Sequence, residues 1–99
     1  MARTLEDMAK FFADRRSEYI KWSRVENRRS RRPGLHALLL LDELAPGDRD
    51  MIAGAEHDLF WLDVDLKHIA KVATDEQLIE LIRCGVKYDE RMGAMYFHT

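Results

Sequence analysis

The 99-residue sequence lacks the features that mark several large classes of protein. A single cysteine, Cys84, excludes a disulfide within the chain and is compatible with a reducing compartment. No apolar run reaches the roughly 18 residues that a membrane-spanning helix needs. Glu6 and Asp7 stand near the start without a central apolar stretch, so we expect no secretory signal. We therefore expect a protein of the cell interior that has no membrane partner.

Motifs of catalysis are also missing. The five glycines are scattered, so no glycine-rich loop is available to hold a phosphate group. No serine occupies a nucleophile elbow. Cys84 falls near the end of a predicted helix, where the negative end of the helix dipole raises the pKa of a thiol and leaves it unreactive. We predict no catalytic residue, no cofactor and no enzymatic activity.

Charge of each sign is concentrated in a different part of the chain. Residues 1–32 hold ten Lys/Arg against five Asp/Glu, whereas residues 33–99 hold six against thirteen. The formal net charge of −2 therefore conceals a basic segment and an acidic one. We interpret residues 1–32 as a basic amphipathic helix or arm and residues 33–99 as a small acidic α+β body, within a single domain. Such asymmetry indicates a partner or a contact of the chain with itself.

The first segment repeats apolar side chains at helical spacing. We name five of them, which share one helical face, the N-terminal ridge: Leu5, Met8, Phe12, Tyr19 and Trp22. Thr4 stands three residues before Asp7 and is suited to cap the first free amides. A long helix is predicted to run to about Asn27. It must end before Pro33, because the residue preceding a proline disfavours the helical conformation.

The N-terminal ridge admits two interpretations. Its side chains either pack on the chain's own core or cover a second copy of the chain. Arg15 falls on the same face and would be costly to bury without a partner. A domain this small gains stability by burying more surface in an assembly. We expect the N-terminal ridge to form the interface of a homo-oligomer.

The middle of the chain predicts short elements. Residues 35–44 are rich in leucine and predict a buried helix. Asp48 is suited to cap a second short helix that ends near residue 55 and buries Met51, Ile52 and Ala55. Residues 59–64 alternate in a way that favours a strand, although a helical pattern could also continue from Met51 through Leu62.

The last third of the chain has clear start and stop signals. Asp65 is placed to cap one helix, and Thr74 with Gln77 forms a capping box for the next, which Gly85 ends. Residues 86–88 and 94–98, joined by a loop over 89–93, predict a C-terminal β-hairpin. The fold class is therefore α+β, with a long N-terminal helix, several short helices and a small antiparallel sheet.

Arginines gather just after the predicted first helix. The cluster comprises Arg24, Arg28, Arg29, Arg31 and Arg32. If the helix continued, four of them would line one side and could contact the phosphates of a nucleic acid, since guanidinium groups bind phosphate bidentately. The alternative is a basic arm that is solvated or docks on the acidic body, and we favour it because the body would repel a polyanion.

Acidic residues and histidines gather between positions 56 and 68. This cluster comprises Glu56, His57, Asp58, Asp63, Asp65 and His68. Carboxylates and imidazoles bind metals, and His57, Asp63 and His68 are the candidates for a small metal-dependent enzyme. Their spacing matches no established zinc or calcium loop, and helix capping explains Asp65. We predict no metal site here.

Two stretches resemble a group of small uncharacterised phage and prophage proteins. They are residues 55–65 (AEHDLFWLDVD) and 80–89 (ELIRCGVKYD), and the similarity covers roughly residues 35–99. The resemblance implies a phage or prophage gene product in a bacterial cytoplasm, of a kind that often binds a host or phage protein. It implies no catalytic residue.

The expected function is a non-enzymatic protein-interaction or regulatory module that forms a homo-oligomer through the N-terminal ridge. The alternative is a nucleic-acid-binding protein that uses the arginine cluster, and the third hypothesis is a small metal-dependent enzyme.

Overall fold

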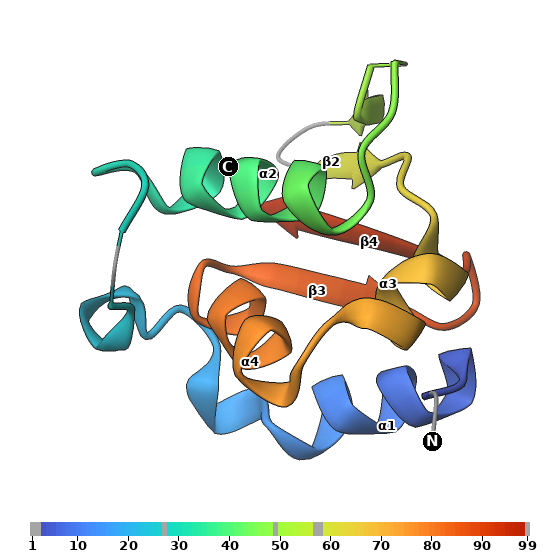
Figure 1. The fold of residues 1–99 in the computed structure, drawn as a ribbon, viewed down its shortest axis with the longest axis horizontal. Helices are drawn as coiled ribbons and strands as arrows, with labels where there is room; N and C mark the ends of the chain where they lie inside the picture. Colours follow the sequence, from blue (N-terminus) through green and yellow to red (C-terminus); the bar gives the residue numbers. More distant parts are fainter. Residues whose placement is uncertain (1–2, 27, 49, 57–58, 99) are drawn as a thin grey trace.

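A computed structural model describes residues 3–26, 28–48, 50–56 and 59–98 of the chain (Figure 1). Within these residues it has four α-helices, two short 3₁₀ turns and one four-stranded sheet, which confirms the predicted α+β class. The elements in chain order are α1 (Leu5–Asp14), η1 (Arg16–Glu18), η2 (Trp22–Arg24), α2 (Pro33–Leu44), β1 (Ile52–Glu56), β2 (Leu59–Leu62), α3 (Leu66–Val72), α4 (Asp75–Arg83), β3 (Val86–Asp89) and β4 (Ala94–His98). None of the described helices combines the length and apolar character that a bilayer crossing requires.

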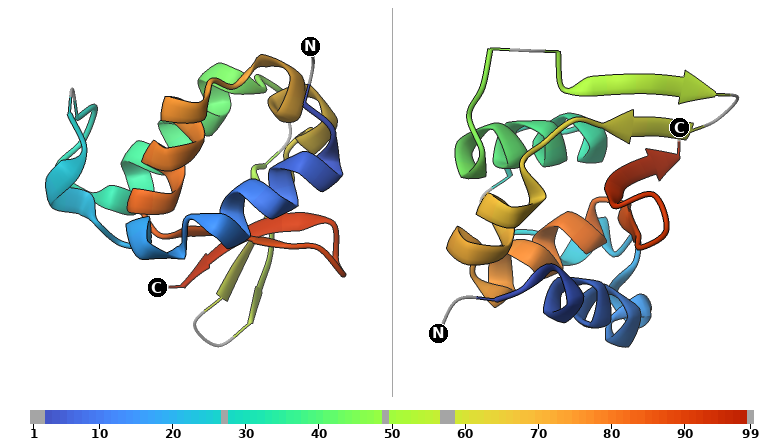
Figure 2. Two further views of the ribbon diagram at one scale, coloured as in Figure 1. Left: turned by 90° about the horizontal axis from the view of Figure 1, so that it is seen from below. Right: turned by 90° about the vertical axis from the view of Figure 1, so that its right-hand side faces the viewer.

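The sheet is antiparallel throughout, with the strand order β1-β2-β4-β3. Its described helices lie on one face and leave the other face open (Figure 2). Side chains alternate between these faces, so Leu62, Met95 and Val86 are buried beneath the helices. Trp61, paired with Tyr96, points to the open face. The strands at the two edges are β1 and β3.

One apolar core joins the sheet to the helices. Its fully buried apolar side chains come from both ends of the chain: Met8, Leu40, Leu41, Ile69, Leu78, Leu81, Val86 and Met95. Capping hydrogen bonds start three of the four helices, as predicted at Thr4, Asp65 and Thr74. Thr4 and Thr74 each form a complete capping box, because the side chain three residues later returns a hydrogen bond to the cap.

The long N-terminal helix predicted to reach Asn27 is wrong. Helix α1 ends at Asp14, and Arg15 leaves the helical conformation at φ −116° and ψ 34°. The chain turns back toward α4, where the Ile20 amide donates a hydrogen bond to the carbonyl oxygen of Ile82 (3.2 Å). Ile20 adopts a φ of 58° there, which is rare for a β-branched residue. This contact with a distant helix outweighs the local helical pattern.

The short helix predicted from Asp48 to residue 55 is also wrong, because residues 52–56 form β1. This strand pairs with β2 and has an irregularity between Ile52 and Gly54. Glycine and a β-branched residue both disfavour helix, and Asp50 rather than Asp48 binds the next free amide, that of Ile52 (3.0 Å). Of the strand predicted over 59–64, residues 59–62 form β2, so the alternative helix running from Met51 is wrong.

The end of the chain pairs β3 with β4 in register, from Val86 opposite Phe97 to Asp89 opposite Ala94. The connecting loop covers residues 90–93 and is one residue shorter than predicted, since Asp89 belongs to β3. The Asp89 carboxylate accepts hydrogen bonds from the amides of Arg91 (2.9 Å) and Met92 (3.1 Å). Before the hairpin, Gly85 ends α4 at a φ of 98°, as its identity predicts.

Candidate binding groove

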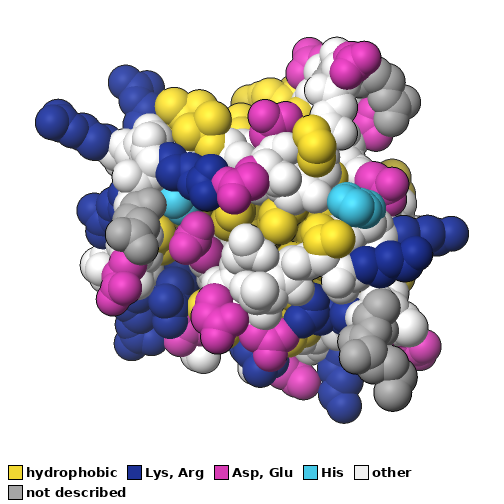
Figure 3. Space-filling view, viewed as in Figure 1, with side chains coloured by type: hydrophobic (Ala, Val, Ile, Leu, Met, Phe, Trp, Pro, Cys, Tyr) yellow, Lys and Arg dark blue, Asp and Glu magenta, His cyan; other side chains and the backbone are white. Residues whose placement is uncertain are grey.

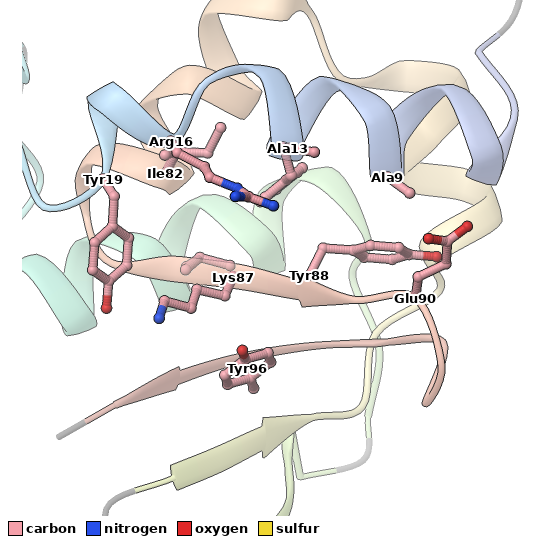
Figure 4. Close-up of a pocket in the computed structure, with 11 residues that line it drawn as sticks. Ala9, Ala13, Arg16, Tyr19, Ile82, Lys87, Tyr88, Glu90 and Tyr96 are labelled. Carbon is pink, nitrogen blue, oxygen red and sulfur yellow. The ribbon is translucent and has the colours of Figure 1, made fainter.

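A groove of about 460 Å³ lies between α1, η1 and the edge strand β3 (Figure 4). Its volume falls within the range of ligand sites in proteins. The residues that line it are Ala9, Phe12, Ala13, Arg16, Tyr19, Ile82, Val86, Lys87, Tyr88, Glu90 and Tyr96. All three tyrosines of the chain are among them. We name this feature the α1–β3 groove.

Small side chains on α1 leave the space open. Ala9 and Ala13 lie one turn apart on the helix, and both line the groove opposite β3. Phe12 is buried below them and contacts the ring of Tyr88, with a centroid distance of 6.1 Å. Aromatic side chains therefore form the base of the groove, and only small side chains project into it from α1.

The other wall is a sheet edge. Within the described residues, β3 pairs with β4 on one side and with no strand on the other. In an antiparallel pair, alternate residues of an edge strand direct their amide and carbonyl groups away from the neighbouring strand. The outward backbone groups of β3 thus lie along the side of the strand that borders the groove.

Charge differs along the groove. Figure 4 shows the Arg16 guanidinium pointing into the space between α1 and β3, and Lys87 lies at the same end. The Lys87 ammonium is 4.6 Å from the centroid of the Tyr19 ring. Glu90 lies near Tyr88 at the opposite end. Burial, and then the charge of Glu90, raises the pKa of Tyr88, so its hydroxyl remains a hydrogen-bond donor at neutral pH.

The structure places the N-terminal ridge against the chain's own core. Met8 is fully buried and Phe12 is 8% exposed. Leu5, Tyr19 and Trp22 are half-buried and pack against the same core. Packing within one chain therefore accounts for Met8 and Phe12, whereas Leu5, Tyr19 and Trp22 remain partly exposed. Tyr19 also lines the groove.

The arginine cluster forms no helical stripe, because residues 24–32 of the described chain contain no α-helix. Arg24 pairs with Glu18 (2.9 Å), Arg29 pairs with Glu43, and the Arg28 guanidinium lies 4.5 Å from the centroid of the Trp22 ring. Figure 3 shows basic side chains projecting from the end of the molecule where this segment lies, with acidic side chains across the helical face. Arg29 therefore docks on the acidic body through Glu43. The line of phosphate contacts predicted along Arg24, Arg28, Arg31 and Arg32 is not formed, because it required a continuous helix.

A buried histidine that the sequence did not single out anchors this basic segment. His36 on α2 is fully buried, and its Nε2 lies 2.8 Å from Glu80 of α4. Its Nδ1 accepts a hydrogen bond from the Arg29 amide (3.0 Å), and its ring meets Trp22 edge-on at 5.4 Å. The only signal in the sequence is a histidine inside a leucine-rich run, since its partner Glu80 lies 44 residues away.

The structure shows no metal-binding cluster among the residues that it describes. His57 lies outside the described residues, and no group of three potential ligands occurs within 3–26, 28–48, 50–56 and 59–98. The Asp65 side chain accepts a hydrogen bond from the His68 amide (3.1 Å), so it acts as a helix cap. Burial, with the nearby charge of Glu80, raises the pKa of Cys84 to about 12, so this thiol is no nucleophile at neutral pH.

Helices α3 and α4 follow each other after a two-residue connection, the chain order of a helix-turn-helix, which the sequence reading did not recognise. In DNA-binding versions the second helix enters the major groove. Here α4 carries Asp75, Glu76 and Glu80 against Arg83 alone, and Arg83 is paired with Glu18 of η1. The charge of α4 opposes contact with a duplex.

Comparison with protein-family models, with curated proteins and with solved structures finds no match to this chain. What it does must therefore be inferred from the groove, the sheet and their charges.

Proposed function

We propose that the chain is a non-enzymatic protein-interaction module that binds an extended, acidic segment of a partner protein in the α1–β3 groove. The observation that carries this proposal is the position of the groove beside the outer edge of β3. A peptide that adds a strand to a sheet edge gains affinity from backbone hydrogen bonds and specificity from side-chain pockets.

The dimensions and charges of the groove support such an occupant. Strand β3 has four residues, which matches a bound segment of about four to five residues at roughly 3.3 Å per residue. Side chains of the segment would alternate between the open side and the space beside Ala9 and Ala13. Arg16 and Lys87 favour a carboxylate at one end of the segment.

Other functions have less support. Two members of the N-terminal ridge, Met8 and Phe12, are buried within one chain, which weakens the support for a homo-oligomer formed through it. The arginine cluster presents no stripe to a nucleic acid, and three of its members already contact Glu18, Glu43 or Trp22. The resemblance to phage and prophage proteins implies a phage or host protein as the partner, and we include such a partner in the proposal.

The proposal is tested with peptides selected on the full-length chain from a random twelve-residue display library. Ala13→Leu fills the groove with a residue that favours helix, and Lys10→Leu adds the same side chain to an exposed position outside it. We expect the selected peptides to be rich in Asp and Glu, and to bind the chain and Lys10→Leu equally. Binding to Ala13→Leu should fall at least tenfold in a calorimetric titration. Equal binding to all three would refute the proposal.

A further inference from the structure

A row of side chains crosses the open face of the sheet. Trp61 of β2 pairs in register with Tyr96 of β4, which pairs in register with Lys87 of β3. Directly opposed residues on neighbouring strands project on the same side of a sheet. The rings of Trp61 and Tyr96 lie 5.0 Å apart between centroids, with an interplanar angle of 41°. We name Trp61, Tyr96 and Lys87 the sheet-face row.

The two aromatic side chains of this row are not part of the core. Trp61 and Tyr96 are half-buried and stand outside the set of apolar residues that are packed against it. Their neighbours on the same strands, Leu62 and Met95, supply the core from the other face. Among the described elements, no helix covers the face that carries the row (Figure 2). The row therefore offers aromatic surface to solvent, with the two rings partly shielding each other.

Cations stand at one end of the row. The Lys87 ammonium lies over the ring of Tyr19, which extends the aromatic surface beyond β3. Arg16 lies in the adjoining α1–β3 groove, and within the described residues its guanidinium has no ion-pair partner. Aromatic faces bordered by cations are complementary to bases joined by phosphates. An aliphatic peptide has neither aromatic bases nor phosphates to match the rings and cations of this surface.

We propose that the sheet-face row binds single-stranded nucleic acid, with unpaired bases stacked on Trp61 and Tyr96 and phosphates near Lys87 and Arg16. The open face of the sheet offers no helix to enter a duplex groove, whereas the faces of unpaired bases are free to stack on the accessible parts of the two rings. This inference concerns the open face of the sheet, which adjoins the proposed peptide site, and Tyr96, Lys87 and Arg16 border both.

The number of cations sets the salt dependence. Neutralising two phosphates of a single strand predicts a slope of about −1.4 in a plot of log K against log salt. Contact through all five residues of the arginine cluster would instead give about −3.5. The measured slope thus distinguishes binding at the sheet-face row from binding at the arginine cluster.

The test measures fluorescence anisotropy of labelled dT12 with the full-length chain at low salt. Loss of one stacking residue is expected to weaken binding about tenfold in Trp61→Ala. Trp61→Phe keeps a ring and should restore most of the affinity. Lys87→Ala should weaken binding and reduce the magnitude of the slope by about 0.7. Lys67→Ala, an exposed change on α3, is the matched control and should bind as the unmodified chain does.

Two further readouts guard against a misfolded variant. The chain has two tryptophans, so Trp22→Phe leaves Trp61 as the only one, and its fluorescence should be quenched as dT12 is added. Ala13→Leu fills the groove beside Arg16 and leaves Trp61 in place, so it should keep the part of dT12 binding that depends on Trp61 even if the peptide proposal fails. Four results would overturn the inference: no binding of dT12, equal binding by Trp61→Ala, equal affinity for a duplex of the same length, or loss of binding on changing Arg31 and Arg32 to alanine.

Discussion

At the scale of single residues, the fully buried side chain of His36 joins two segments that lie far apart in the sequence. Its two ring nitrogens connect the segment after η2 to α4, through the Arg29 amide and the Glu80 carboxylate. Because Nδ1 accepts a hydrogen bond, the ring proton is placed on Nε2, which donates to Glu80. A buried polar side chain is stable only when its partners are present.

Replacing His36 with alanine should therefore destabilise the fold. The substitution opens a cavity and leaves the Arg29 amide without its acceptor, so we expect the free energy of unfolding to fall by about 2 to 4 kcal/mol. Leu39→Ala on the same helix removes a side chain that is 40% exposed and should cost less than about 1 kcal/mol. Urea denaturation measures both. A loss for His36→Ala no larger than for Leu39→Ala would show that the junction contributes little.

The lowered pKa of Glu18 predicts how the stability of the fold depends on pH. The hydrogen bond from Arg83 Nε (2.6 Å), aided by the charges of Arg83 and Arg24, holds the pKa of Glu18 below its ordinary value of 4.5. A carboxyl with a depressed folded-state pKa stabilises the fold above its unfolded pKa, and this contribution is lost as pH falls through the folded value. The melting temperature should therefore drop below about pH 4.5, and Glu18→Gln should show a smaller drop. Parallel curves for the two proteins would contradict this account.

At the scale of elements, the starts of helices could be predicted from the sequence and some of their ends could not. Thr4, Asp65 and Thr74 each cap through a partner three residues away, so the signal is local. The end of α1 depends on Ile20 and α4, and β1 depends on pairing with β2. The groove could not be predicted from the sequence for the same reason. Ala9 and Ala13 leave space for it only because β3, some seventy residues later, lies opposite them.

The turn at Gly85 links two of these elements and requires glycine. Its φ of 98° is strained for any residue with a Cβ, and a Cβ there would lie 3.5 Å from Ile20 Cγ1. We expect Gly85→Ala to lower the free energy of unfolding by about 1 to 2 kcal/mol. Gly47→Ala, where a Cβ meets nothing within 4 Å, is the control and should change stability little. If chemical denaturation shows no loss of stability in Gly85→Ala, the turn does not require glycine.

At the scale of the whole molecule, the basic and acidic parts form one structure. Arg3 pairs with Asp75 and Arg29 pairs with Glu43, while Glu18 pairs in the opposite sense with Arg83. The charge asymmetry seen in the sequence is thus partly satisfied within the chain. The basic part also supplies Met8, Phe12 and Val25 to the core.

Residues 33–99 should consequently fail to fold alone. Deletion of residues 1–32 removes three buried apolar side chains and exposes the surfaces of α3, α4 and β3 that they cover. We expect the shortened chain to lack a cooperative thermal transition by circular dichroism, whereas the full chain has one. A sharp transition in the fragment would show that the N-terminal part is an accessory arm.

The most direct test of the proposed interaction is hydrogen exchange at the amides of residues 86–89, measured by nuclear magnetic resonance with and without a selected acidic peptide. Strand addition predicts that the outward-facing amides of β3 become protected, while the Ala13→Leu variant shows no change. Protection confined to other parts of the chain, or unchanged exchange at β3 under saturating peptide, would contradict the account.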